Sequence, residues 1–211
     1  IRDVLGSRGL GDVYKRQYLT LRRFIIVTGL YKKEGDRMPY EVGEYVIYSS
    51  LGICQVIQND AHVSLAGDEN ELYYILAPIE KRLGKAYVPH SRSAELRHTL
   101  NKEEALHSLD MVFDLEPDTF QDTNSHLVQE HFRELIRSND FLSLLLVCKS
   151  MHARIQEQES KKHGASLTYK KLLDDAQRRI YGELSIVLDM EIEEVPSFIR
   201  DYSLQHESRS K

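Results

Sequence analysis

The chain has 211 residues, of which 41% are hydrophobic and 29% charged, with five prolines and eleven glycines. This length accommodates one ordinary domain or two small ones, and the composition excludes a disordered, collagen-like or membrane-spanning chain. The formal net charge of -5, from 28 basic and 33 acidic residues, excludes a protein that coats nucleic acid by electrostatic attraction alone. Any contact with DNA is therefore expected to be local.

Residues 1–37 differ from the rest because they lack a sustained helical or strand period and carry nine basic but only four acidic residues. Their longest apolar run, Phe24 to Val27, is too short for a secretory signal. The codons of Glu34, Gly35 and Asp36 can contain GGAG a few nucleotides before the codon of Met38, as in a bacterial ribosome-binding site. We therefore expect the native protein to begin at Met38 and residues 1–37 to be a non-native translated leader. Residues 38–211 then carry a net charge of -10.

The first regular segments read as short strands. Two β-rich runs, 45–48 and 53–57, flank a turn that ends in Gly52, which predicts a hairpin. Further strands are predicted at 72–76, before Pro78, and at 86–88, before Pro89, because proline cannot donate a hydrogen bond to a sheet. Four or five short strands in about fifty residues favour a small barrel that closes on itself.

The period becomes helical after Pro89. Asn101 to Glu104 has the form of a capping box before a helix that reaches about residue 113. Further helices are predicted from Thr123 or Asn124 to about 137, from Phe141 to about 161, and from Ser166 or Thr168 to about 188, with a short segment at 196–199. The predicted fold class is α+β: a β domain over 38–92, an all-α helical bundle over 93–204 and a polar tail over 205–211.

Motifs for catalysis are absent from the sequence. It contains no GxSxG, HExxH or phosphate-binding glycine loop, and the closest histidines, His126 and His131, lie on different sides of a predicted helix. Cys54 and Cys148 lie among apolar residues outside any metal-ligand spacing, which indicates small buried side chains and a reducing cytoplasm. We expect no enzymatic activity, no catalytic residue, no metal, no cofactor and no small-molecule substrate.

Basic residues gather in the third and fourth predicted helices and the loop between them. This group admits two interpretations: ordinary solvated helix faces, or a modest surface that faces phosphates. Its candidate DNA-binding members are Lys149, Arg154, Lys161, Lys162, Lys170 and Lys171.

Six segments together carry a family resemblance. In the strand-rich part they are 40–56 (YEVGEYVIYSSLGICQV), 73–76 (YYIL) and 87–89 (YVP), and in the helical part 137–140 (RSND), 166–173 (SLTYKKLL) and 194–199 (EVPSFI). In order and spacing these segments resemble the start, the later strands and the helices of the CarD/CdnL family of transcription regulators, in particular its clostridial branch. The resemblance covers about residues 38–202.

The resemblance implies a bacterial, cytoplasmic regulator whose Tudor-like barrel binds the β-subunit lobe of RNA polymerase. Its helical domain would reach promoter DNA, weakly and only when tethered to polymerase, and would modulate open-complex formation. Better-known members insert a tryptophan wedge into the minor groove, whereas this chain has no tryptophan and has Ser125 at that position. Leu127, Val128 and Glu130 stand where basic residues are expected, and Phe120 is a candidate substitute for the wedge.

The predicted polymerase-binding residues lie on the hairpin and the late strand, where an exposed strand edge favours β-strand addition. They are Ile53, Gln55, Lys85, Tyr87, Val88 and Pro89. The absent tryptophan favours an alternative function: an adaptor that binds polymerase or another partner through the barrel and never contacts DNA. Neither interpretation involves a membrane.

Overall fold

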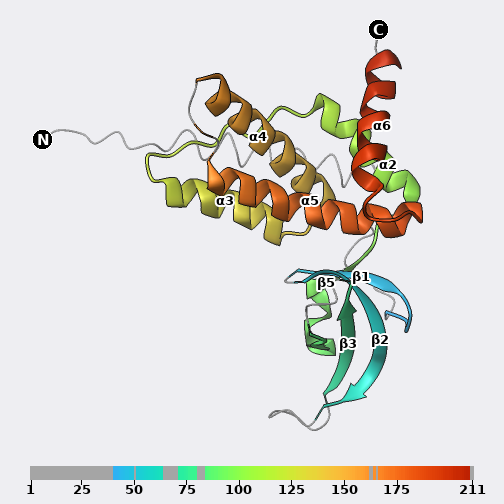
Figure 1. Ribbon diagram of the computed structural model, residues 1–211. Helices are drawn as coiled ribbons and strands as arrows, with labels where there is room; N and C mark the ends of the chain where they lie inside the picture. The colour runs from blue at the N-terminus through green and yellow to red at the C-terminus, as the bar shows by residue number, and fades with distance from the viewer. Residues whose placement is uncertain are drawn as a thin grey trace, which may run out of the picture. The chain divides into compact units, whose positions relative to one another are not determined.

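A computed structural model describes residues 40–49, 51–63, 71–79, 84–161, 164 and 166–209. Residues from Tyr40 onward belong to one compact unit, which comprises an antiparallel β-sheet followed by helices (Figure 1). The expected α+β class is therefore confirmed. The leader predicted over 1–37 lies outside the described residues.

The sheet has five antiparallel strands in the order β4-β3-β2-β1-β5. Their bounds are β1 Tyr45–Tyr48, β2 Gly52–His62, β3 Leu72–Pro78, β4 Ala86–Pro89 and β5 Leu96–His98. Strand β2 extends beyond the expected residue 57 because register shifts between Val56 and Ala61 allow it to keep pairing with β3. Strand β5, which pairs with β1, lies beyond residue 92, where we expected the β domain to end.

One face of this sheet forms an apolar core to which all five strands contribute. The buried side chains are Val46 of β1, Cys54 and Val56 of β2, Tyr74 and Leu76 of β3, Val88 of β4 and Leu96 of β5, together with Tyr40. Tyr40 contacts the edge of the Tyr74 ring and donates its hydroxyl to the carbonyl oxygen of Leu96, 2.9 Å away. Side chains from opposite ends of the strand order therefore meet in one cluster.

The expected closed barrel is not confirmed, because the strand order leaves β4 and β5 at opposite edges of an open sheet. The 3₁₀ helix η1, His90–Glu95, connects these two edge strands and also contacts β3. A side-chain core combined with a helical turn between the edges allows the sheet to bury its apolar face without a complete ring of strand hydrogen bonds.

The helices follow the predicted pattern closely up to residue 188. They are α2 Lys102–Asp114, α3 Ser125–Arg137, α4 Phe141–Ser160, α5 Leu167–Leu188 and α6 Val195–Arg209. The predicted capping box is present, since Asn101 accepts from the Glu104 N–H and the Glu104 carboxylate accepts from the Asn101 N–H. Asn124 and Asp140 cap α3 and α4 with their side chains, which satisfies backbone N–H groups that a helix leaves unpaired.

Helix α4 packs against α2, α3 and α5 and carries much of the helical core. Its first half is apolar around most of its circumference and is buried, as expected for a helix surrounded by others. Phe132 of α3, Met151 of α4 and Leu184 of α5 are fully buried. The helical part therefore has an apolar core of its own.

The C-terminal segment differs from the expectation of a short element at 196–199 and a frayed tail from Gln205. Helix α6 continues to Arg209 because Phe198, Tyr202 and His206 recur at a spacing of four residues. The Tyr202 hydroxyl donates to Asp110, 2.8 Å away, and the His206 ring stacks on Phe113 of α2 with centroids 4.2 Å apart. An aromatic stripe, rather than an aliphatic one, holds this helix.

Candidate functional site

The predicted polymerase-binding residues occupy two faces of the sheet. Gln55 pairs with Ala77, and Tyr87 pairs with Ile75, so the alternation of side chains places Gln55 and Tyr87 on the same outer face. Val88 points to the opposite face, where it is buried in the sheet core. Its side chain is therefore not exposed for a partner.

Ile53 lies on the outer face but packs against the helices. Only 9% of it is exposed, and its Cγ2 would lie 3.1 Å from a Cβ placed on Gly182 of α5. Ile53 therefore belongs to the junction between sheet and helices. Gln55, on the same face, donates its side-chain N–H to the carbonyl oxygen of Gly43 at 3.1 Å.

Strand β4 offers an accessible edge. It pairs with β3 on one side and is the last strand of the sheet on the other. Tyr87 is 45% exposed, Lys85 just before the strand is exposed, and Pro89 is half-buried at its end. Lys85, Tyr87 and the adjacent backbone are thus the accessible part of the predicted set.

Two of the predicted DNA-binding cations are bound to backbone carbonyls. The ammonium group of Lys149 donates to the carbonyl oxygens of Val112 and Phe113, 2.7 and 3.0 Å away. These carbonyls lie near the C-terminus of α2, where a cation also interacts favourably with the helix dipole. Lys149 therefore fixes α2 to α4.

Arg154 holds the segment that connects α2 to α3. Its Nη2 donates to the carbonyl oxygens of Asp118 and Phe120, 3.2 and 2.5 Å away. The guanidinium also lies 5.1 Å from the centroid of Phe132 and 5.8 Å from that of Tyr169. Its Nε is also buried. The contacts of Arg154 are therefore made mostly within the protein rather than at the surface.

Asp118 and His131 complete this anchoring of the connecting segment. His131 Nε2 lies 2.7 Å from Asp118 Oδ2, and the imidazole stacks on Phe120 with centroids 4.3 Å apart. Burial raises the pKa of Asp118, but the hydrogen bonds from His131 and the Phe120 N–H, with the charges of His131 and Arg154, outweigh it and lower the pKa overall. Phe120, the candidate wedge, is thus stacked and half-buried.

The remaining predicted cations lie at the end of α4 and the start of α5. Lys161 is exposed and pairs with Glu157 at 2.6 Å, while Lys170 and Lys171 are exposed on the first turns of α5. Lys162 lies outside the described residues. The exposed part of the predicted DNA-binding set is therefore Lys161, Lys170 and Lys171.

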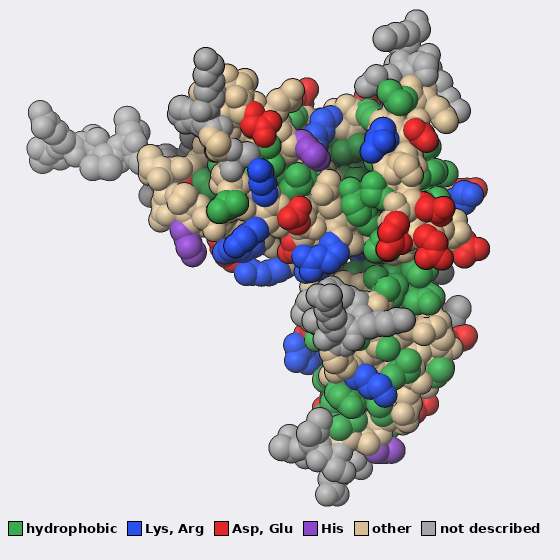
Figure 2. Space-filling view, in the orientation of Figure 1, with side chains coloured by type: hydrophobic (Ala, Val, Ile, Leu, Met, Phe, Trp, Pro, Cys, Tyr) green, Lys and Arg blue, Asp and Glu red, His purple; other side chains and the backbone are tan. Residues whose placement is uncertain are grey.

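The start of α3 holds residues that the resemblance places near DNA. Ser125 is exposed, and Leu127 is 48% exposed, which makes Leu127 the largest exposed apolar side chain of α3. Glu130 accepts from Arg137 at 2.6 Å, which lowers the pKa of Glu130 and offsets its charge. Figure 2 shows Lys and Arg side chains along the lower edge of α3 and α5 in that view, and acidic side chains beside the junction of α5 and α6.

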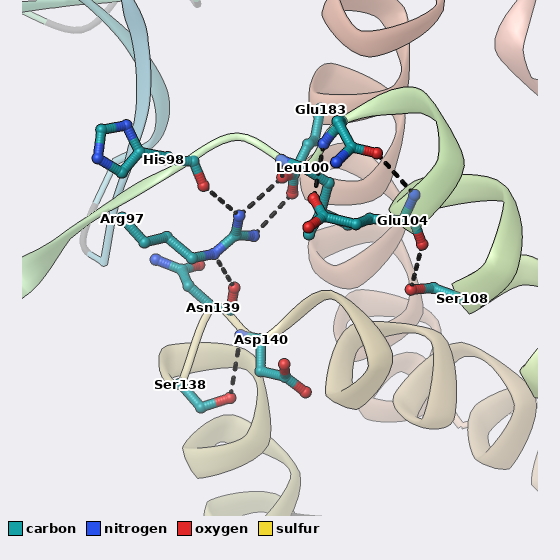
Figure 3. Close-up of polar contacts among 10 residues, drawn as sticks. Arg97, His98, Leu100, Glu104, Ser108, Ser138, Asn139, Asp140 and Glu183 are labelled. Atoms are coloured by element: carbon teal, nitrogen blue, oxygen red, sulfur yellow. Dashed lines mark hydrogen bonds and ion pairs between the residues drawn. The ribbon is translucent and has the colours of Figure 1, made fainter. Parts of the chain in front are cut away.

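Sequence reasoning missed a set of polar contacts that joins the sheet to the helices, here called the polar clamp and composed of Arg97, Asn139, Arg179 and Glu183. Figure 3 shows Arg97, Asn139 and Glu183 of this set. Arg97 of β5 makes two hydrogen bonds of 2.7 Å to the Glu183 carboxylate, and its Nε donates to the carbonyl oxygen of Asn139 at 2.7 Å. Arg179 donates to Asn139 Oδ1 at 2.6 Å and to the carbonyl oxygen of Ser49 in the β1–β2 turn at 3.2 Å.

The polar clamp is deeply placed. The side chain of Glu183 is 1% exposed and that of Arg97 is 21% exposed. Asn139, in the turn between α3 and α4, is buried and has a φ of 51°, a left-handed conformation that asparagine adopts more readily than most residues. Arg97 and Glu183 are 86 positions apart, so no local sequence pattern could have found this set.

Metal-ligating side chains do not gather in the described part of the chain. No three His, Cys, Asp or Glu side chains among those residues gather as a metal site requires. Burial raises the pKa of the Cys54 and Cys148 thiols to about 12, which makes them poor nucleophiles. None of the described helices is long and apolar enough to cross a membrane.

In comparison with known proteins, no family model and no curated protein matches the chain.

Proposed function

We propose that this chain is a bacterial transcription regulator of the CarD/CdnL type, which acts in the cytoplasm by binding the β-subunit lobe of RNA polymerase and modulating open-complex formation without catalysis. The observation that supports this most is the exposed β4 edge with the outward-facing Tyr87. An extended segment of the partner would add to this edge as a further strand, with Tyr87 and Lys85 contacting its side chains.

The geometry of the sheet is compatible with a Tudor-like, strongly curled form. A flat sheet of five strands is about 19 Å wide between its edge strands, at about 4.8 Å per spacing. The six residues of η1, which has a kink at Arg92, lead from one edge strand to the other. This short connection supports edges that curl toward each other, as in a partial barrel.

The DNA-facing part of the proposal rests on Lys161, Lys170 and Lys171. These side chains are exposed near the end of α4 and the start of α5. Three cations provide weak, salt-sensitive contacts with phosphates. Tethering by polymerase raises the local concentration of DNA, so that weak contacts suffice.

The test of the polymerase contact compares variants of β4 with matched changes elsewhere. Tyr87→Ala and Lys85→Glu should weaken binding of the full chain to the isolated β lobe at least tenfold in calorimetry. Leu167→Ala and Lys102→Glu, which change an exposed apolar side chain and an exposed lysine on the helices, should leave the affinity unchanged. No binding by the parent chain, or equal affinities for all variants, would refute the assignment.

An adaptor that never contacts DNA is the second candidate, and the engagement of Lys149 and Arg154 by backbone carbonyls favours it. DNA footprinting of the polymerase complex separates the two functions. Protection at the upstream edge of the bubble that disappears in a Lys170→Glu/Lys171→Glu variant supports the regulator. A footprint that the chain leaves identical to that of polymerase alone, with intact lobe binding, supports the adaptor.

A further inference from the structure

We propose that the polar clamp holds the sheet and the helices in one orientation, and that Arg97 and Glu183 are positioning residues that set where the DNA-facing helices lie when the sheet is bound to a partner. The identity of the two partners rests on the proposed function. The rigidity itself does not, because it concerns contacts within the chain.

The Arg97 guanidinium makes directional contacts with α5 and with the turn between α3 and α4 at once. Two of its nitrogens bind both oxygens of Glu183, and Nε binds the carbonyl oxygen of Asn139 (Figure 3). Because the guanidinium is planar and its donors point in fixed directions, these bonds are all satisfied in only one orientation. Glu183 also accepts from the N–H of Leu100 at 3.0 Å, which fixes the chain where it leaves the sheet.

A second set of contacts lies at the β1–β2 turn. Arg179 reaches the carbonyl oxygen of Ser49 on the sheet side and Asn139 Oδ1 on the helix side. On the next turn of α5, Gly182 brings the helix backbone close to Ile53. The sheet therefore contacts α5 through β5 and through the β1–β2 hairpin, and contacts at two separate elements resist rotation better than contacts at one.

The energetics favour a role in orientation over a role in stability. A buried ion pair contributes little net stability compared with apolar residues of similar size, because both charges lose their hydration. An altered orientation that kept Glu183 buried without Arg97 would be costly, since an uncompensated buried carboxylate is strongly unfavourable. The polar clamp thus penalises other orientations selectively.

The consequence for function follows from the length of α5. Glu183 lies twelve residues after Lys171 on this helix, which corresponds to about 18 Å at 1.5 Å per residue. A rotation of about 20° at the polar clamp would move Lys171 by roughly 6 Å, close to the rise of two base pairs. Loss of the fixed orientation would therefore displace the cations from the phosphates they contact.

Distances measured between spin labels in the full chain test the rigidity directly. Labels at Gln58→Cys on β2 and Glu134→Cys on α3, both exposed positions, report the orientation of sheet and helices. A labelled chain without these cysteines controls for reaction at Cys54 and Cys148. We expect one narrow distance distribution for the parent, and a distribution at least twice as broad for Arg97→Met/Glu183→Leu.

The matched control is Arg137→Met/Glu130→Leu, which removes an ion pair of 2.6 Å from the surface of α3. It should keep the narrow distribution. Arg97→Lys retains the charge but cannot make the same bidentate contact and Nε bond, so it should give an intermediate width and carries the test if the double variant does not fold. A narrow distribution at the parent distance in both Arg97 variants would overturn the proposal.

The functional arm distinguishes failure of this inference from failure of the proposed function. The Arg97→Met/Glu183→Leu variant should bind the β lobe within twofold of the parent while losing most of the parent's effect on open-complex lifetime. A broadened distribution together with an unchanged effect on lifetime would refute the positioning role. Absence of lobe binding by the parent would refute the proposed function and leave the distance test of rigidity intact.

Discussion

Replacement of Gly182 by alanine tests the close packing of α5 on the sheet. Gly182 is buried in α5, and an alanine Cβ would lie 3.1 Å from Cγ2 of Ile53 on β2. Carbon atoms in good contact are about 3.5–4.0 Å apart, so either the side chain or the helix must shift by several tenths of an ångström. The substitution therefore strains the contact between Ile53 and α5.

Two opposing contributions determine how much Gly182→Ala changes the free energy of unfolding. Alanine is favoured over glycine in a helix by about 0.8–1.0 kcal/mol. Overpacking of a close contact costs about 1–3 kcal/mol. We expect Gly182→Ala to lower the free energy of unfolding by about 1 kcal/mol, which corresponds to a decrease in Tm of about 2–4 °C for a unit of this size.

Thermal and urea unfolding measure this change, with Gly164→Ala as the matched control. Gly164 has no atom within 4 Å of its would-be Cβ, so that substitution should be neutral or stabilising by up to about 1 kcal/mol. In an Ile53→Ala background, where the clashing methyl is removed, Gly182→Ala should instead stabilise by up to about 1 kcal/mol. A higher Tm for Gly182→Ala in the parent, without coupling to Ile53, would refute the close contact.

Three further predictions concern local features. Burial raises the pKa of Asp118, but the bond with His131 and nearby charges lower it overall. The ionised Asp118 therefore stabilises the fold fully above the pKa that it has in the unfolded chain, and this stabilisation is lost as pH falls through the pKa of the folded chain. Urea unfolding at pH 7, 5 and 3 should show that the free energy of unfolding decreases less with acidification in Asp118→Asn than in the parent. Cys54 is buried and Cys148 is half-buried, and with pKa values of about 12 both should react slowly with a thiol reagent at pH 8 until urea unfolds the chain; rapid reaction of either thiol in the native chain would contradict the raised pKa. Asn101→Ala, which removes the capping box of α2, should cost about 1 kcal/mol of unfolding free energy, and an unchanged value would show that the cap contributes nothing.

Local patterns in the sequence determined most of the secondary structure. The box at Asn101, the cap at Asp140 and the turn ending in Gly52 each act within a few residues, so their effect is readable from neighbours alone. The end of α6 was missed because its stripe consists of aromatic and histidine side chains whose partners, such as Phe113, lie about ninety positions away. Strand β5 was missed because three residues carry too little periodicity.

The candidate interfaces divide in the same way. The sequence located the late strand and the cations, but burial decided which side chains are accessible: Val88 and Ile53 are enclosed, whereas Tyr87 is exposed. In the sequence Lys149 is indistinguishable from an ordinary surface lysine, and only the structure shows that it donates to a carbonyl oxygen of α2.

The sequence by itself therefore determined the α+β class, most helix and strand positions and the chemistry that each face carries. Tertiary structure alone decided the open strand order, the extent of α6 and the polar clamp that joins Arg97 to Glu183 across 86 positions. The physical reason is the range of the interactions: caps, turns and amphipathic periods act over a few residues, whereas burial and ion pairing depend on groups that only folding brings together.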